Sequence, residues 1–105
     1  MEFKIEKASV LVLIAEDHPD ILDLLQDAFE HGGFVVLPVN SAEAATSAID
    51  DPQHQVRALV TDIRLGSTLC GWDVARRARE KSPELPVVYT TGSEGSDWPS
   101  LGAPN

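Results

Sequence analysis

Three acidic residues stand where short apolar runs give way to polar sequence. Glu16 and Asp17 follow the apolar run 10–15, and Asp62 lies near the end of another run, 56–63. Carboxylates that are brought together repel one another, and a divalent cation is the natural way to keep them ionised. Oxygen ligands favour magnesium over zinc. We therefore expect a magnesium site if the fold brings these acids together.

Asp62 is the expected nucleophile of such a site. A magnesium ion with free coordination positions holds phosphate oxygens and neutralises the charge that gathers when a phosphoryl group passes to a carboxylate. Thr91, at the end of a later apolar run, adds a hydroxyl that can contact a phosphate. The expected chemistry is transfer of a phosphoryl group to Asp62.

Four apolar runs alternate with segments of helical periodicity. Continuous apolar runs are typical of parallel strands buried on both faces, and we expect strands at 10–15, 34–39, 56–63 and 86–91. Between them we expect a helix from Pro19 to the stop at Gly32, an alanine-rich helix that ends near 49, and a helix from Gly71 to the stop at Ser82. This alternation predicts an open α/β fold, in which ligands bind beyond the carboxyl ends of the strands.

Two of the expected helices have recognisable local features. The first helix carries an apolar stripe made of Ile21, Leu24, Leu25, Ala28 and Phe29. The second helix has two alternative N-caps, Asn40 and Ser41, with Glu43 three residues after Asn40 as in a capping box.

Composition limits the classes of function. The 105 residues suffice for one domain, and a net charge of -9 argues against direct contact with nucleic acid or an anionic membrane. A single cysteine, Cys70, excludes an internal disulfide and a multi-cysteine zinc site. No apolar run approaches the length needed to span a bilayer, and we expect a cytoplasmic location.

Four motifs in order carry a resemblance to a known family. The segments LVLIAEDHPDI, LVTDIRLG, GWDVARRARE and LPVVYTTG, within residues 9–93, resemble the receiver domain of response regulators in two-component signalling. The resemblance implies a flavodoxin-like, doubly wound parallel sheet in three α/β/α layers with strand order 2-1-3-4-5. It implies a single receiver domain over residues 1–105, with an N-terminal arm at 1–8 and a loop-like tail at 94–105.

The resemblance also assigns the metal ligands. It implies that Asp17 binds Mg²⁺ directly, that Glu16 acts mainly through water, and that Asp62 is both a ligand and the phosphoacceptor. The backbone carbonyl of Arg64 would be a further ligand.

The phosphate itself is expected to contact the end of the fourth strand. The resemblance implies that the Thr91 hydroxyl binds the phosphate and that the backbone N–H of Gly92 approaches it. Thr90 is the alternative register, and we prefer Thr91 because it precedes the small residue Gly92.

Three departures from the family pattern affect what can be carried over. Leu65 and Gly66 stand where many receivers have Met-Pro, and Cys70 stands where an acid often precedes the glycine. No lysine between Gly92 and Asn105 matches the one that pairs with the phosphate in the family. We therefore expect the family's fifth strand and helix to be missing.

The resemblance implies a signalling domain rather than an enzyme. A histidine kinase or phosphotransfer protein would supply the phosphoryl group, and a downstream protein partner would read the change. The exposed edge of the fourth strand also suggests a homodimer. The alternative is a phosphorylation-independent interaction or dimerisation module. A phosphohydrolase is disfavoured because no D-x-D pair surrounds Asp62, and His18 is interpreted as a residue that fronts the first helix rather than a metal ligand.

Overall fold

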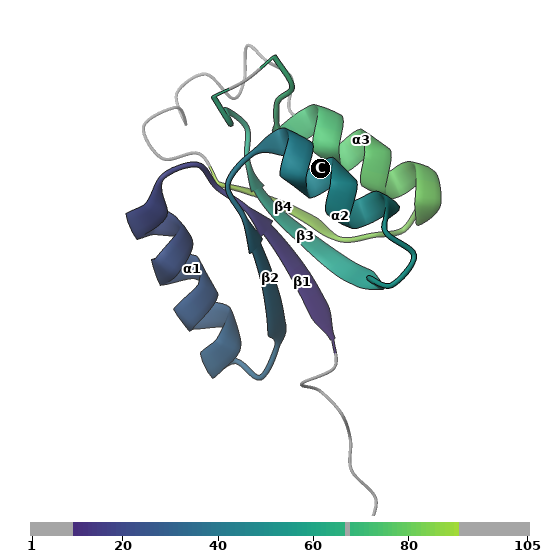
Figure 1. The fold of residues 1–105 in the computed structure, drawn as a ribbon. Helices are drawn as coiled ribbons and strands as arrows, with labels where there is room; N and C mark the ends of the chain where they lie inside the picture. Colours follow the sequence, from purple (N-terminus) through teal and green to yellow (C-terminus); the bar gives the residue numbers. More distant parts are fainter. Residues whose placement is uncertain (1–9, 67, 91–105) are drawn as a thin grey trace, which may run out of the picture.

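The computed structural model describes residues 10–66 and 68–90, which form a parallel four-stranded sheet with helices on both faces (Figure 1). The strand order is β2-β1-β3-β4, and each neighbouring pair is parallel. In chain order the elements are β1 (Leu11–Ala15), α1 (Pro19–His31), β2 (Val35–Val39), α2 (Ala42–Asp50), β3 (Val56–Asp62), α3 (Gly71–Lys81) and β4 (Val87–Thr90). The predicted doubly wound α/β fold is confirmed. Residues 91–105, on which the expectation of a missing fifth strand depends, lie outside the described residues.

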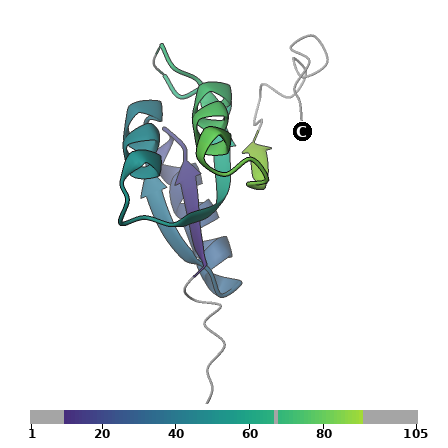
Figure 2. The same ribbon diagram turned by 90° about the vertical axis from the view of Figure 1, so that its right-hand side faces the viewer.

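Side chains that alternate along the central strands divide the core between two helical layers. Leu13, Ala15 and Leu59 pack toward the buried faces of α2 and α3. Val12, Ile14 and Val60 point the other way and pack with residues of α1. Figure 2 shows the ribbon turned by 90° about the vertical axis. The central strands β1 and β3 are therefore covered on both faces, which explains their continuous apolar sequences.

Helix α1 faces the sheet with a narrower stripe than its sequence suggests. Leu22, Leu25 and Phe29 pack against the sheet. Ile21, Leu24 and Ala28 are exposed, Leu24 to 69%. The expected stripe was wrong at these three positions. The reason is that α1 has apolar residues on more than a third of its circumference, and one face of a sheet can bury only the residues that point directly at it.

Helix α2 begins at the second of the two candidate caps. The Ser41 hydroxyl oxygen accepts a hydrogen bond from the Ala44 backbone N–H at 3.0 Å, which satisfies one of the free donors at the helix start. The capping box predicted from Asn40 and Glu43 is therefore wrong. Within the part of the chain that the structure describes, no helix has the length and apolarity that crossing a membrane requires.

Candidate functional site

Four side chains meet at the carboxyl edge of the sheet, beyond the ends of β1 and β3. Glu16, Asp17, His18 and Asp62 each offer one ligand atom, and these atoms all lie within 4.8 Å of one another. The two acids that follow β1 meet the acid that ends β3 because β1 and β3 are adjacent and parallel. The sheet thus brings together the three acids that the sequence singled out.

Glu16 is a buried carboxylate held in one orientation. Its side chain is only 1% exposed, and its backbone N–H donates to the carbonyl of Val39 at 3.0 Å, which ties it to the end of β2. Its Oε2 accepts a hydrogen bond from the His18 backbone N–H at 3.1 Å. Burial raises the pKa of Glu16, and the negative charge of Asp62 adds to the rise while the hydrogen bonds from His18 oppose it.

Asp62 is positioned by the backbone that follows it. The Arg64 N–H donates to Asp62 Oδ1 at 3.2 Å. Burial is the main cause that raises the pKa of Asp62, and the charge of Asp17 raises it further. The ionised form therefore has a free-energy cost at this position, which a nearby cation would offset.

Asp17 supplies the observation that tests whether a cation fits. Its Oδ1 atom is buried and accepts no hydrogen bond from the residues that the structure describes, although the His18 ring nitrogen lies 3.2 Å away. A buried carboxylate oxygen without a donor is costly, and a divalent cation among oxygen donors would satisfy it. The donor set thus fits a hard divalent cation such as Mg²⁺.

Gly66 in the β3–α3 connection and Gly71 at the start of α3 allow the backbone to approach the acids, and the sequence predicted no such approach for either. Gly66 has a φ of 71°, and a Cβ atom there would lie 3.1 Å from Asp17 Oδ2. A Cβ atom on Gly71 would overlap the carbonyl oxygen of Asp62. Only glycine combines the left-handed conformation at Gly66 with this close contact. The signal was present in the sequence as a glycine within the loop that follows Asp62 and a second glycine directly after that loop.

Of the residues predicted to bind phosphate at the end of the fourth strand, the structure describes only the alternative, Thr90. Thr90 is the register partner of Asp62, whereas Thr91 and Gly92 lie outside the described residues. The preference for Thr91 over Thr90 stays a prediction.

His18 lies closer to the acids than its sequence context suggested. It is the N-cap residue of α1, as expected, but its side chain makes no capping hydrogen bond. Its Nδ1 atom is instead 3.1 Å from Glu16 Oε2 and 3.2 Å from Asp17 Oδ1. The hydrogen bond to Glu16 is the first cause that raises the pKa of His18. The sequence signal was only its position next to the acidic pair.

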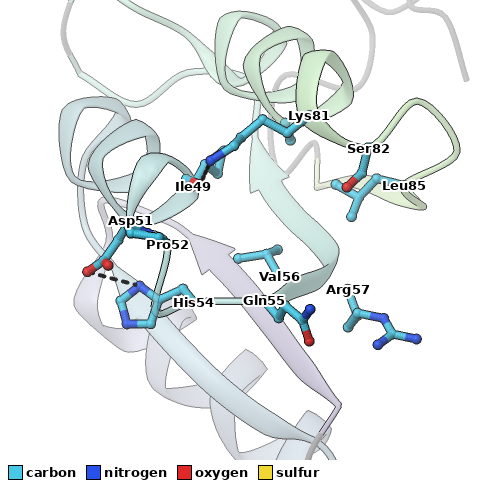
Figure 3. Close-up of a pocket in the computed structure, with 11 residues that line it drawn as sticks. Ile49, Asp51, Pro52, His54, Gln55, Val56, Arg57, Lys81, Ser82 and Leu85 are labelled. Carbon is cyan, nitrogen blue, oxygen red and sulfur yellow. Dashed lines mark hydrogen bonds and ion pairs between the residues drawn. The ribbon is translucent and has the colours of Figure 1, made fainter.

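A pocket of about 450 Å³ lies at the opposite, amino-terminal end of β3 (Figure 3). It is lined by the segment after α2, the start of β3 and the end of α3. His54 Nδ1 lies 3.8 Å from Asp51 Oδ2 at its edge, and Lys81 Nζ donates to the carbonyl of Ile49 at 3.0 Å. None of the clustered acids lines this pocket, so the expected phosphoryl chemistry does not belong there.

Comparisons with known proteins identify the family of this chain. The family model of the response regulator receiver domain matches residues 12–98. The response regulator SaeR of Staphylococcus aureus (strain USA300) is 28% identical over 80 residues, which cover 76% of this chain and 33% of that protein. The chain thus spans about a third of the length of the curated relatives it matches.

Solved structures share the fold. A response regulator receiver protein from Sinorhizobium medicae WSM419 is 34% identical with a TM-score of 0.83, and the match covers 92% of this chain and 77% of that one. A sensor protein from Polaromonas sp. JS666 is 27% identical with a TM-score of 0.69, over 84% of this chain and 70% of that one. Receiver domains characteristically bind Mg²⁺ at an acidic pocket, and the described part of this chain contains an acidic cluster. The chain belongs to the family of response regulator receiver domains, a signalling module of two-component systems.

Proposed function

We propose that this receiver domain accepts a phosphoryl group on Asp62 in a magnesium-dependent reaction and relays the signal through a change in protein binding. The observation that carries the proposal is the convergence of Glu16, Asp17 and Asp62 at one edge of the sheet, with ligand atoms within 4.8 Å of one another. The donor would be the phosphohistidine of a histidine kinase or of a phosphotransfer protein.

The residues that would hold Mg²⁺ are Asp17, Asp62, Glu16 and the backbone carbonyl of Arg64. When bound, the ion neutralises charge on the phosphoryl oxygens as they approach the acids. The unsatisfied Oδ1 atom of Asp17 is the strongest local support for this role. Glu16, held by the His18 backbone N–H, acts through water in the arrangement that the family implies.

Asp62 acts as the nucleophile. One of its carboxylate oxygens attacks phosphorus as the P–N bond of the donor's phosphohistidine breaks, and the released imidazole nitrogen keeps the electron pair and takes up a proton. The Arg64 N–H, which donates to Asp62 Oδ1, reduces the motion of the carboxylate before the attack. The Thr91 hydroxyl and the Gly92 N–H would then contact the phosphate oxygens, with Thr90 as the alternative to Thr91.

The phosphoryl group would alter the surface around this edge and change the affinity for a downstream protein partner. Receiver domains interact with kinases and with effector domains, and this chain would do so from the sheet edge that carries the acids. We propose no direct contact with nucleic acid, because the chain has a net charge of -9. Its function is that of a signalling phosphoacceptor rather than an enzyme acting on a separate substrate.

Incubation with acetyl phosphate and Mg²⁺, followed by intact-mass spectrometry, tests the proposal. We expect one added phosphoryl group, none without Mg²⁺, and none in the Asp62→Asn variant. Asp51→Asn, which changes another acid at the far end of the domain, is the matched control and should be labelled like the wild type. Persistent labelling of Asp62→Asn would move the acceptor elsewhere.

The alternative function is a phosphorylation-independent interaction or dimerisation module. Unchanged partner binding after complete phosphorylation of Asp62 would favour this second function.

A further inference from the structure

The ring of His18 completes the acidic cluster with a nitrogen donor. Its Nδ1 atom lies 3.1 Å from Glu16 Oε2 and 3.2 Å from Asp17 Oδ1. The ring is 68% exposed, so it is not held against the acids by burial within the core. Its proximity to both carboxylates is a property of the first turn of α1, where His18 is the N-cap.

The distances between these atoms match those between neighbouring ligands of one ion. Two adjacent ligands of an octahedral cation, each about 2.1 Å from the metal, lie about 3.0 Å apart. The distance of 3.2 Å between His18 Nδ1 and Asp17 Oδ1 is close to this value. These two atoms and the ligand atom of Asp62 lie within 4.8 Å of one another, so small side-chain rotations would bring them onto a common ion, on which Glu16 would act through water.

We propose that His18 Nδ1 is a direct metal ligand, and that it gives this site a preference for divalent first-row transition cations over Mg²⁺. The inference rests on the proposed function, because it concerns the same acids. Imidazole nitrogen is a good ligand for Mn²⁺, Co²⁺, Ni²⁺ and Zn²⁺, whereas Mg²⁺ strongly prefers oxygen. One nitrogen added to the carboxylates therefore raises the affinity for the transition cation more than the affinity for Mg²⁺.

Two features separate this role from a purely structural one. As an N-cap, His18 would direct a side-chain acceptor toward the helix N–H groups, but it makes no such hydrogen bond. As an ion-pair partner, it would satisfy the nearby oxygens, yet Asp17 Oδ1 still accepts no hydrogen bond from the described residues. A metal ion bound by both side chains would satisfy that oxygen and use the ring nitrogen at the same time.

Pulsed electron paramagnetic resonance of the whole chain with Mn²⁺ tests the coordination directly. We expect a ¹⁴N coupling from one imidazole in the wild type and its loss in His18→Gln. His31→Gln is the matched control: His31 Nδ1 lies 3.2 Å from the carbonyl of Asp27 near the other end of α1, and this variant should keep the coupling. A wild-type spectrum without nitrogen coupling would overturn the proposal.

Calorimetric titrations with Ni²⁺ and Mg²⁺ test the preference. In His18→Gln the Ni²⁺ affinity should fall by about tenfold more than the Mg²⁺ affinity, in line with the loss of a first-row metal ligand. Equal losses for both cations, or no loss for either, would contradict the proposal. The Asp17→Asn variant tests the proposed function separately. If its Mg²⁺ affinity equals that of the wild type, the acids do not bind the metal and the proposed function itself is contradicted.

Discussion

At the scale of single residues, the acids at the sheet edge have a higher free energy in their ionised form than exposed acids have. Burial raises the pKa of both Glu16 and Asp62, the charge of Asp62 adds to the rise at Glu16, and the charge of Asp17 adds to the rise at Asp62. A site of this kind is unfavourable without a cation and favourable with one. The same charges that would bind the metal therefore reduce the stability of the metal-free fold.

Replacement of Asp62 by its neutral isostere should stabilise the metal-free protein. The folded pKa of Asp62 is raised, so the stability contributed by this group is lowest above that pKa and increases as the pH falls through it. At pH 7 Asp62→Asn removes the cost of the ionised form, and its melting temperature without metal should rise by roughly 2–5 °C. Asp23→Asn, which removes the same charge from the exposed side of α1, should not raise it. A melting temperature of Asp62→Asn at or below the wild type in chelator would contradict this account.

Phosphorylation rates of alanine variants can distinguish the two threonines at the end of the fourth strand. We predict that Thr91→Ala slows phosphorylation by acetyl phosphate by about tenfold or more, because it removes a hydrogen bond to a charged group worth about 1.5–3 kcal/mol. The Mg²⁺ affinity should change little, since the acids hold the metal. A larger effect of Thr90→Ala, whose residue pairs with Asp62 across β3 and β4, would assign the role to Thr90.

At the scale of elements, most of the structure could be predicted because both faces of β1 and β3 are buried. Their continuous apolar runs place these strands to within one residue of their observed ends. The face of helix α1 that packs on the sheet was harder to predict, because Ile21 and Leu24 look equivalent to Leu22 and Leu25 in sequence. Which of them pack is decided by the rotation of the helix over the sheet, a tertiary property that periodicity alone does not contain.

The first turn of α3 provides a prediction at this scale. Asp73 Oδ2 accepts a hydrogen bond from the Cys70 backbone N–H at 2.9 Å, which lowers the pKa of Asp73. Asp73→Ala should therefore cost about 0.5–2 kcal/mol in urea unfolding. This stability is present above the unfolded pKa of about 3.9 and is lost as the pH falls through the lower folded value. Asp73→Asn keeps an acceptor oxygen and should retain most of the stability, whereas equal losses in both variants would contradict the role of this hydrogen bond.

At the scale of the whole molecule, the parallel strand order explains why acids from two distant segments could be predicted to meet. Glu16 and Asp17 follow β1 and Asp62 ends β3, and the carboxyl ends of these strands lie at the same edge. The contribution of His18 could not be predicted, because its ring reaches the acids through the local turn between β1 and α1. The close approach of Gly71 to Asp62 likewise depends on how the β3–α3 connection passes over the sheet.

The outer strand leads to a prediction about association. Among residues 10–66 and 68–90, β4 is hydrogen-bonded to β3 alone, and Val88 is 54% exposed. An exposed apolar edge strand favours pairing with another chain. We predict a concentration-dependent dimer in sedimentation equilibrium, weakened by Val88→Lys but not by Leu24→Lys, which places the same charge on α1. A monomer at all concentrations would refute it.

Reductive trapping of the phosphorylated protein tests the central claim most directly. Borohydride converts an aspartyl phosphate to homoserine, so peptide sequencing by mass spectrometry after treatment with acetyl phosphate, Mg²⁺ and borohydride identifies the acceptor residue. The structure predicts homoserine at position 62 and at no other acid of the cluster. Homoserine at position 17, or no conversion in a protein that binds Mg²⁺ and is fully folded, would contradict the assignment of Asp62 as the phosphoacceptor.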